Sequence, residues 1–313
     1  MKPETIEVVK KLNSLTSNKI KSKSPVIIIT EKESAKEKES CDTQQKTSIK
    51  NNSSLNFSKN EKKSFPDGSV YIGEIDQETG KKNGQGKLTF PNGDWYEGQF
   101  KQDLYHGNGV FIEQSTNSKY EGNWEEGMKN GQGKEFFGDG SVYEGNYIKN
   151  KRNGKGKLIL SNGSEYLGDF NDDKIEGKGI FKWNEKKIYY GEWENNSLNG
   201  IGSFIQGNKK YIGHFRSDKK EGIGINYFYE SNNFLIGKWI RDSIEGLAIF
   251  SSFKMGKQIW EMKNNKMIKV YSLENDFEKL KETEEFQELE NFYNFVIKSE
   301  YRDKQMLLAE TLF

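Results

Sequence analysis

The sequence predicts an all-β repeat array: an elongated single-layer antiparallel meander of about eight hairpins, flanked by a disordered N-terminal tail and a C-terminal amphipathic helix. All 32 glycines of the 313-residue chain lie between Gly68 and Gly256. Aromatic residues make up 13% of a chain that is only 33% hydrophobic, so the ordered part depends on rings more than on aliphatic side chains. A Tyr-x-Gly unit recurs at nearly constant spacing, which is typical of repeat architectures.

Residues 1–63 are predicted to be a disordered, basic, low-complexity tail. They carry fourteen lysines against eight acidic residues and few apolar side chains. Such a composition cannot bury enough surface to offset the entropy lost on folding. The short apolar segment Val26–Ile29 could still join the sheet of a partner as an edge strand.

Residues 64–271 contain the repeat. Each unit begins with Tyr-x-Gly (Leu-x-Gly in the last), and a large side chain follows two residues after the glycine. In most units a Gly-x-Gly pair comes seven residues later, and successive units start 22–25 residues apart. The unit starts are Tyr71, Tyr96, Tyr120, Tyr143, Tyr166, Tyr189, Tyr211 and Leu235.

Each unit predicts a β-hairpin. Because side chains alternate between the faces of a strand, Tyr120, Gly122 and Trp124 share one face. A second strand is expected from Gly131, after a six-residue loop. Asn-Gly and Asp-Gly pairs between units supply the positive φ of tight turns.

Glycine normally weakens a strand, so its place among aromatic residues needs a reason. We expect Gly131 and Gly133 to leave room for rings such as Tyr120 and Trp124, which then replace an aliphatic core. About 16 strands at roughly 4.8 Å each would span about 75 Å. The structural or partner-docking aromatic residues assigned to this face are Tyr71, Tyr96, Phe100, Tyr120, Trp124, Tyr143, Tyr147, Tyr166, Phe170, Tyr189, Trp193, Tyr211, Phe215 and Trp239.

The pattern of a unit is Tyr-x-Gly-x-Trp, followed by six residues, Gly-x-Gly, an aromatic residue and a glycine-containing turn. This pattern resembles the MORN repeat (membrane occupation and recognition nexus). The resemblance covers about residues 65–250. The chain departs from the pattern in its long first loop, at Glu113 and Gln206, where an aromatic residue is expected, and in its degenerate last unit. We expect that unit to act as a cap, with Trp260–Tyr271 supplying one or two closing strands.

Residues 272–313 are predicted to form one amphipathic helix of roughly 30 residues, about 45 Å long. Asn275 and Glu278 have the spacing of a capping pair. The segment carries eleven acidic residues against five basic ones, which disfavours anionic membranes. The helix is long enough to cover about half of the aromatic face, and packing on a partner is also open. Its docking face consists of Phe277, Leu280, Leu289, Phe292 and Val296.

The sequence predicts no catalytic, cofactor-binding or metal site. The segments "GQGK" and "GKGK" look like phosphate-binding loops, but they lead into a strand and not into a helix N-terminus. The two histidines, His106 and His214, occupy non-equivalent repeat positions, whereas a zinc site or catalytic triad needs convergent partners. Paired carboxylates such as Asp172 and Asp173 are interpreted as solvated charges in exposed loops.

Net charge and cysteine content limit which partners and which cellular compartment the sequence predicts. A net charge of +1 argues against nucleic acid as a partner. The single cysteine, Cys41, and the lack of a long apolar run predict a soluble cytoplasmic protein.

These features predict a non-catalytic scaffold that binds other proteins. The resemblance to MORN-only proteins implies axonemal or cytoskeletal partners, as in the radial spoke head of cilia, and self-association is also open. One alternative is a phosphoinositide-binding tether between membrane and cytoskeleton, which the near balance of acids and bases across the repeats disfavours. A further alternative is an accessory subunit of an enzyme.

Overall fold

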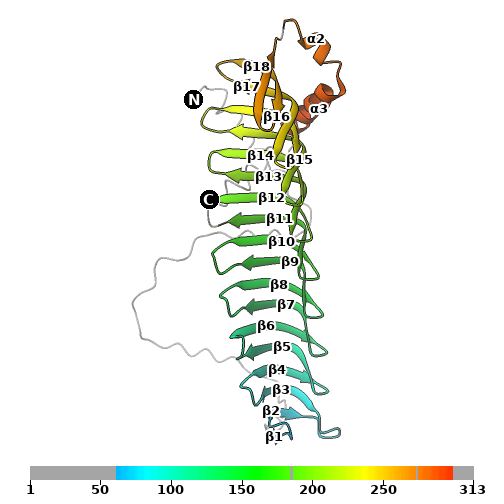
Figure 1. The fold of residues 1–313 in the computed structure, drawn as a ribbon. Helices are drawn as coiled ribbons and strands as arrows, with labels where there is room; N and C mark the ends of the chain where they lie inside the picture. The colour runs from blue at the N-terminus through cyan, green and yellow to red at the C-terminus, as the bar shows by residue number, and fades with distance from the viewer. Residues whose placement is uncertain (1–60, 184–185, 273, 299–313) are drawn as a thin grey trace, which may run out of the picture. The chain divides into compact units, whose positions relative to one another are not determined.

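The computed structural model describes residues 61–183, 186–272 and 274–298. The predicted tail up to residue 60, including Val26–Ile29, and the end of the predicted helix lie outside these ranges. The described chain forms one open antiparallel sheet in which each strand pairs with the next in sequence (Figure 1). This order confirms the predicted single-layer meander.

The described part of the sheet has nineteen strands. They are β1 (Glu61–Ser64), β2 (Val70–Ile75), β3 (Lys82–Thr89), β4 (Trp95–Lys101), β5 (Leu104–Glu113), β6 (Ser118–Glu125), β7 (Met128–Phe136), β8 (Val142–Ile148), β9 (Lys151–Ile159), β10 (Glu165–Asn171), β11 (Lys174–Trp183), β12 (Lys187–Glu194), β13 (Ser197–Gln206), β14 (Lys209–Arg216), β15 (Lys219–Phe228), β16 (Asn233–Ile240), β17 (Ser243–Ser252), β18 (Gly256–Lys263) and β19 (Lys266–Tyr271).

From the unit at 96 onwards the hairpin within a unit closes with a two-residue turn, so the expected six-residue loop was wrong there; in the first unit residues 76–81 separate β2 from β3. Between β10 and β11 the turn residues Asp172 and Asp173 have φ of +47° and +69°, the left-handed backbone of a type I′ turn. A β-bulge between Gly168 and Phe170 absorbs the shift in register. The turn was not recognised because polar pairs such as Asp-Asp adopt positive φ here in place of Asn-Gly.

Glycine next to a tyrosine ring leaves space, as expected, but only at one of the two Gly-x-Gly positions. A Cβ on Gly133 would lie 2.3 Å from the Tyr120 hydroxyl oxygen. At Gly131 the nearest atoms would belong to Asn123, and φ is +89°. Gly131 therefore serves the backbone conformation and not the rings, which corrects the prediction for that residue.

The C-terminal segment forms two helices in its described part, α2 (Phe277–Leu280) and α3 (Glu284–Lys298), and not one continuous helix. The Thr283 hydroxyl donates to the Leu280 carbonyl at 2.6 Å and accepts from the Phe286 N–H at 3.3 Å. Thr283 thus separates the helices and caps α3. The capping pair was also wrong, because Asp276 is the N-cap residue of α2 and makes no side-chain cap hydrogen bond.

Helix α3 packs on its own sheet, on the face opposite to the tyrosines, so it does not cover the aromatic face as the sequence had allowed. We call the tyrosine-bearing face the front face and the other the back face. Leu289 and Phe292 lie in one apolar cluster with Ile212, Ile225 and Ile236 on the back of the sheet. The signal was the middle residue of Tyr-x-Gly, which points backwards and changes from glutamate in the units at 96, 120 and 143 to isoleucine in the unit at 211.

Candidate protein-docking face

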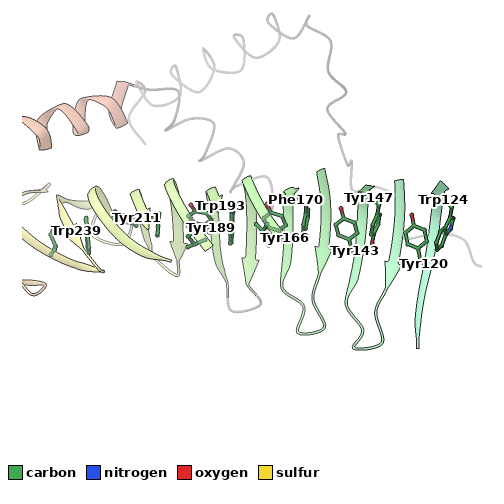
Figure 2. Packing of buried hydrophobic residues seen from close by; sticks show 14 of the residues in the cluster. Tyr120, Trp124, Tyr143, Tyr147, Tyr166, Phe170, Tyr189, Trp193, Tyr211 and Trp239 are labelled. Carbon is green, nitrogen blue, oxygen red and sulfur yellow. The ribbon is translucent and has the colours of Figure 1, made fainter. Parts of the chain in front are cut away.

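The fourteen assigned aromatic residues form one continuous ladder of edge-to-face rings on the front face. Figure 2 shows the part of the ladder from Tyr120 to Trp239. The centroid of Tyr120 lies 5.0 Å from that of Trp124 in its own unit and 5.2 Å from that of Tyr147 in the next. The planes cross at 84° and 90°, the arrangement that aligns a positive ring edge with a negative ring face. The rings therefore link every unit to its neighbours.

The ladder is the core of the sheet. Its residues expose between 0% and 6% of their surface. The hydroxyl of the tyrosine that begins each unit donates to the carbonyl three residues on, at 2.7 Å from Tyr71 to Glu74 and 3.0 Å from Tyr120 to Asn123. Burial raises the pKa of Tyr71 to about 12. Almost none of the surface of these residues is left for a partner to contact.

A second set of aromatic residues lies beside the ladder and is only partly buried. Each follows the Gly-x-Gly pair of its unit, which is the sequence signal that identifies it. Trp183 extends the set, with its ring centroid 4.4 Å from that of Phe181 and 5.8 Å from that of Phe204. We call this set the outer aromatic row: it consists of Phe90, Phe111, Phe137, Phe181, Trp183, Phe204 and Phe228.

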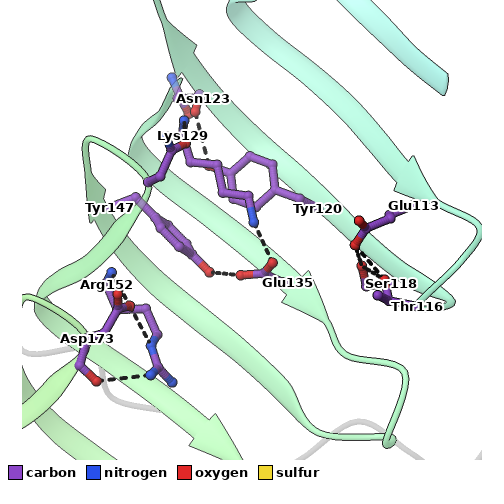
Figure 3. Close-up of polar contacts among 11 residues, drawn as sticks. Glu113, Thr116, Ser118, Tyr120, Asn123, Lys129, Glu135, Tyr147, Arg152 and Asp173 are labelled. Carbon is purple, nitrogen blue, oxygen red and sulfur yellow. Dashed lines mark hydrogen bonds and ion pairs between the residues drawn. The ribbon is translucent and has the colours of Figure 1, made fainter. Parts of the chain in front are cut away.

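One unit places a carboxylate on the front face (Figure 3). Glu135 pairs across the sheet with Tyr120 and Tyr143, where most other units have an apolar residue and the unit at 211 has Asn226. It accepts a hydrogen bond from the Tyr147 hydroxyl at 2.7 Å and forms an ion pair with Lys129. Burial, together with the Glu135 charge, raises the pKa of Tyr147 well above its ordinary value. The Lys129 and Glu135 side chains are only 20% and 15% exposed, so the ammonium is neutralised within the sheet.

The second residue of the two-residue turn bonds to the preceding unit. Asp173 Oδ1 accepts from the Arg152 backbone N–H at 2.9 Å and from Arg152 Nε at 3.1 Å (Figure 3). Asp172 pairs with Lys151 at 3.0 Å. The pair lies in an exposed turn, as predicted, with side chains 63% and 47% exposed, but both carboxylates also bond to the preceding unit. The same side-chain-to-backbone bond recurs at Asp103, Asn150, Asn196, Asp218, Asp242 and Asn265.

The residues assigned to the helix face lie in the back-face cluster. Leu289, Phe292 and Val296 are buried there, and the cluster also contains Phe277 and Leu280, which are partly buried. Sequence reasoning missed Phe286, which is buried in the same cluster at the helical spacing of three residues before Leu289.

No group of three metal-ligating side chains occurs in the part of the chain that the structure describes. His214 lies beside Phe292, with ring centroids 6.2 Å apart, and its Nδ1 is 3.2 Å from the Ile223 carbonyl oxygen. Within residues 61–183, 186–272 and 274–298, no helix is long and apolar enough to span a bilayer.

Seven segments of the chain match the MORN repeat model. The matched residues are 80–95, 96–112, 120–142, 143–165, 166–185, 189–209 and 211–227. The chain is a MORN repeat protein. The match confirms the resemblance carried by the Tyr-x-Gly and Gly-x-Gly motifs, and it identifies the sheet as an array of structural repeats.

The MORN array is also similar in fold to solved structures. The TCP10 domain of Danio rerio CPAP, in complex with a peptide of Danio rerio STIL, is 12% identical with a TM-score of 0.38 and covers 68% of this chain and 98% of that one. The TCP10c domain of Drosophila melanogaster Sas-4 is 13% identical with a TM-score of 0.29 and covers 65% and 98%. A search of curated proteins finds no match.

Proposed function

We propose that this MORN repeat protein is a non-catalytic scaffold that binds other proteins through its front face, within a ciliary axoneme (as in the radial spoke head) or a cytoskeletal assembly. The observation that carries the proposal is the outer aromatic row. A single sheet needs a second layer over each apolar face, and contiguous exposed apolar surface marks interaction sites. In the described residues α3 supplies such a layer only on the back face.

The proposal divides the aromatic residues into two roles. The ladder holds the array together, because its rings are buried and contact each other. The outer aromatic row offers rings that are large and partly exposed, the residue type enriched where partners bind. The ciliary or cytoskeletal setting rests on the resemblance to MORN-only proteins.

Site-specific photo-crosslinking tests this proposal. A photoreactive phenylalanine analogue replaces Phe137 or Phe181 on the front face, and Leu167 on the back face serves as the control because it is 52% exposed. The full chain is then illuminated in an axonemal or cytoskeletal fraction. We expect the two front positions to crosslink stoichiometric structural proteins and the back position to crosslink few.

Other results would contradict the scaffold. Equal crosslinking from Leu167 and from the two front-face positions would show that the front face is not the binding surface. Recovery of one enzyme alone would favour an accessory subunit. Salt-sensitive flotation with anionic vesicles would favour the phosphoinositide tether.

A further inference from the structure

Two units of the array differ in one charge at equivalent positions. In the unit at 120, Lys129 lies over the Tyr120 ring at 4.8 Å and forms an ion pair with Glu135, six residues later. In the unit at 211, Lys220 lies over the Tyr211 ring at 4.5 Å. The residue six positions later is Asn226, so this unit keeps the lysine and lacks its carboxylate.

Lys220 is held in an aromatic, partly dehydrated site without an ion-pair partner. Its ammonium also lies 4.6 Å from the centre of the Trp239 ring. Burial lowers the pKa of Lys220, an effect that the Asp242 carboxylate opposes and the Lys209 ammonium reinforces. Asp242 accepts from the Lys220 backbone N–H at 2.8 Å, but no carboxylate of the described chain lies within ion-pairing distance of the Lys220 ammonium.

The missing carboxylate coincides with a cleft. Lys220 and Asn226 line a front-face cavity of about 520 Å³, whose other lining residues include Lys209, Phe228 and Trp239. Among the described residues, none that lines this cavity is acidic. The equivalent cavity beside Lys129, which Glu135 lines, measures about 230 Å³.

Trp239, one of the residues that line the cleft, also has a hydrogen-bond donor without an acceptor among the described residues. The indole N–H of Trp239 is buried and makes no hydrogen bond with the described residues. The equivalent N–H of Trp124 donates to the Gly109 carbonyl at 3.2 Å, and that of Trp193 donates to the Gly179 carbonyl at 3.3 Å. Buried donors are rarely left unpaired, so each one calls for a specific explanation.

We infer that this cleft binds an acidic side chain of a partner protein, held in an extended segment with apolar neighbours. The partner's carboxylate takes the place beside Lys220 that Glu135 occupies beside Lys129. Phe204 and Phe228 of the outer aromatic row contact the flanking apolar side chains. This inference rests on the proposed use of the front face for protein binding and adds the chemistry of one contact.

A carboxylate fits the site better than a phosphate on a membrane. In the unit at 120 a carboxylate already pairs with the equivalent lysine, because Glu135 forms an ion pair with Lys129. The partly buried aromatic side chains of the cleft suit an aspartate or glutamate that is flanked by apolar residues in a peptide. A lipid bisphosphate needs a wider basic surface. Arginine is absent from the lining, which carries only the two lysines, Lys209 and Lys220.

Panning a displayed library of random heptapeptides against the full chain tests the inference. We expect enrichment of peptides with an aspartate or glutamate between apolar residues. Replacing that acid by its amide in a synthetic peptide should weaken binding about tenfold or more, as for a lost charge-assisted hydrogen bond. Lys220→Met and Asn226→Glu should each weaken it similarly, the second because an internal carboxylate competes.

Two control variants distinguish an effect of net charge on peptide binding from an effect of the cleft itself. Lys87→Met removes one lysine from the back face, and Asn123→Glu adds one carboxylate at an exposed position of another unit. Both should leave peptide binding unchanged. Asn226→Glu should also raise the melting temperature of the free protein relative to Asn226→Gln, by restoring the pair seen at Lys129.

Each outcome decides a different point. Enriched peptides without an acid would overturn the carboxylate inference and leave the docking face standing. A lower melting temperature for Asn226→Glu than for Asn226→Gln would overturn it without any peptide. Absence of all enrichment would count against the docking face as well. Binding to vesicles with phosphatidylinositol bisphosphate, lost in Lys220→Met, would replace the protein partner by a membrane.

Discussion

The ring of Tyr120 lies against the α-carbon of Gly133 on the neighbouring strand, so closely that a β-carbon there would stand 2.3 Å from the tyrosine hydroxyl oxygen. The hydroxyl itself is fixed by its bond to the Asn123 carbonyl at 3.0 Å. The ring cannot withdraw without losing that hydrogen bond and its edge-to-face contacts. Glycine at this position is therefore part of the packing of the ladder.

Gly133→Ala should destabilise the protein by about 3 kcal/mol, because the added methyl forces the Tyr120 ring out of place. The measurement is the free energy of unfolding in urea. Gly163→Ala measures a backbone cost alone, because Gly163 has a positive φ of +82° and open space around its missing Cβ, whereas Gly133 does not have a positive φ. Unchanged stability in Gly133→Ala would contradict the close packing of the Tyr120 ring.

Trp124→Ala should cost roughly 3 kcal/mol of unfolding free energy, because Trp124 is 6% exposed and contacts rings on three strands. Ile148→Ala, at a residue that is 52% exposed, should change stability by about 0.5 kcal/mol or less. Unchanged stability with lost partner binding in Trp124→Ala would make Trp124 a docking residue after all.

Asp173→Gly should weaken the link between successive units by about 1 kcal/mol, because it removes the oxygen that accepts from the Arg152 N–H. Glycine tolerates the +69° φ of this position, so backbone strain is not added. Asp173→Asn should cost less, since asparagine fills the same role at Asn150 and Asn196. Amide hydrogen exchange at Arg152 reports the bond directly, and unchanged protection in Asp173→Gly would contradict this role.

Leu289→Ala should cost about 3 kcal/mol and loosen α3 from the back face, because Leu289 is 1% exposed in the isoleucine-lined cluster. Proteolysis within α3 should become faster. The control is Glu288→Ala, an exposed position one residue earlier. Similar protection of α3 in both variants would show that Leu289 does not hold the helix.

Alkaline pH should unfold the array. Burial raises the pKa of Tyr71 and Tyr143 to about 12, from 10.0, and raises that of Tyr120 and Tyr211 further. The unfolded chain loses its phenolic protons near pH 10 while the folded chain keeps them, so stability is full below that pH and falls as the pH rises towards 12. Circular dichroism and tyrosinate absorbance should change together, and tyrosinate formation in a chain that stays folded would contradict the burial.

The repeat and its chemistry could be read from the sequence, because they depend on local periodicity. Tyr-x-Gly at steady intervals predicts both the hairpins and the ladder residues, since alternation along a strand decides which side chains share a face. It also predicts the space beside Gly133. The unit boundaries follow from turn glycines such as Gly93 and Gly163, whose φ is positive.

The remaining features depend on contacts between segments that local patterns do not encode. Only the tertiary structure shows that α3 covers the back face, because this depends on where Ile212 and Ile236 lie relative to a helix some fifty to eighty residues later. Only cross-strand register shows that Asp173 reaches Arg152, 21 residues earlier. The pairing of Lys129 with Glu135, six residues apart on β7, and the absence of an equivalent pair at Lys220 on β15 likewise become visible only in the folded structure. Sequence period determined which residues are buried together; the three-dimensional arrangement decided which charges meet, because ion pairs and hydrogen bonds require specific distances.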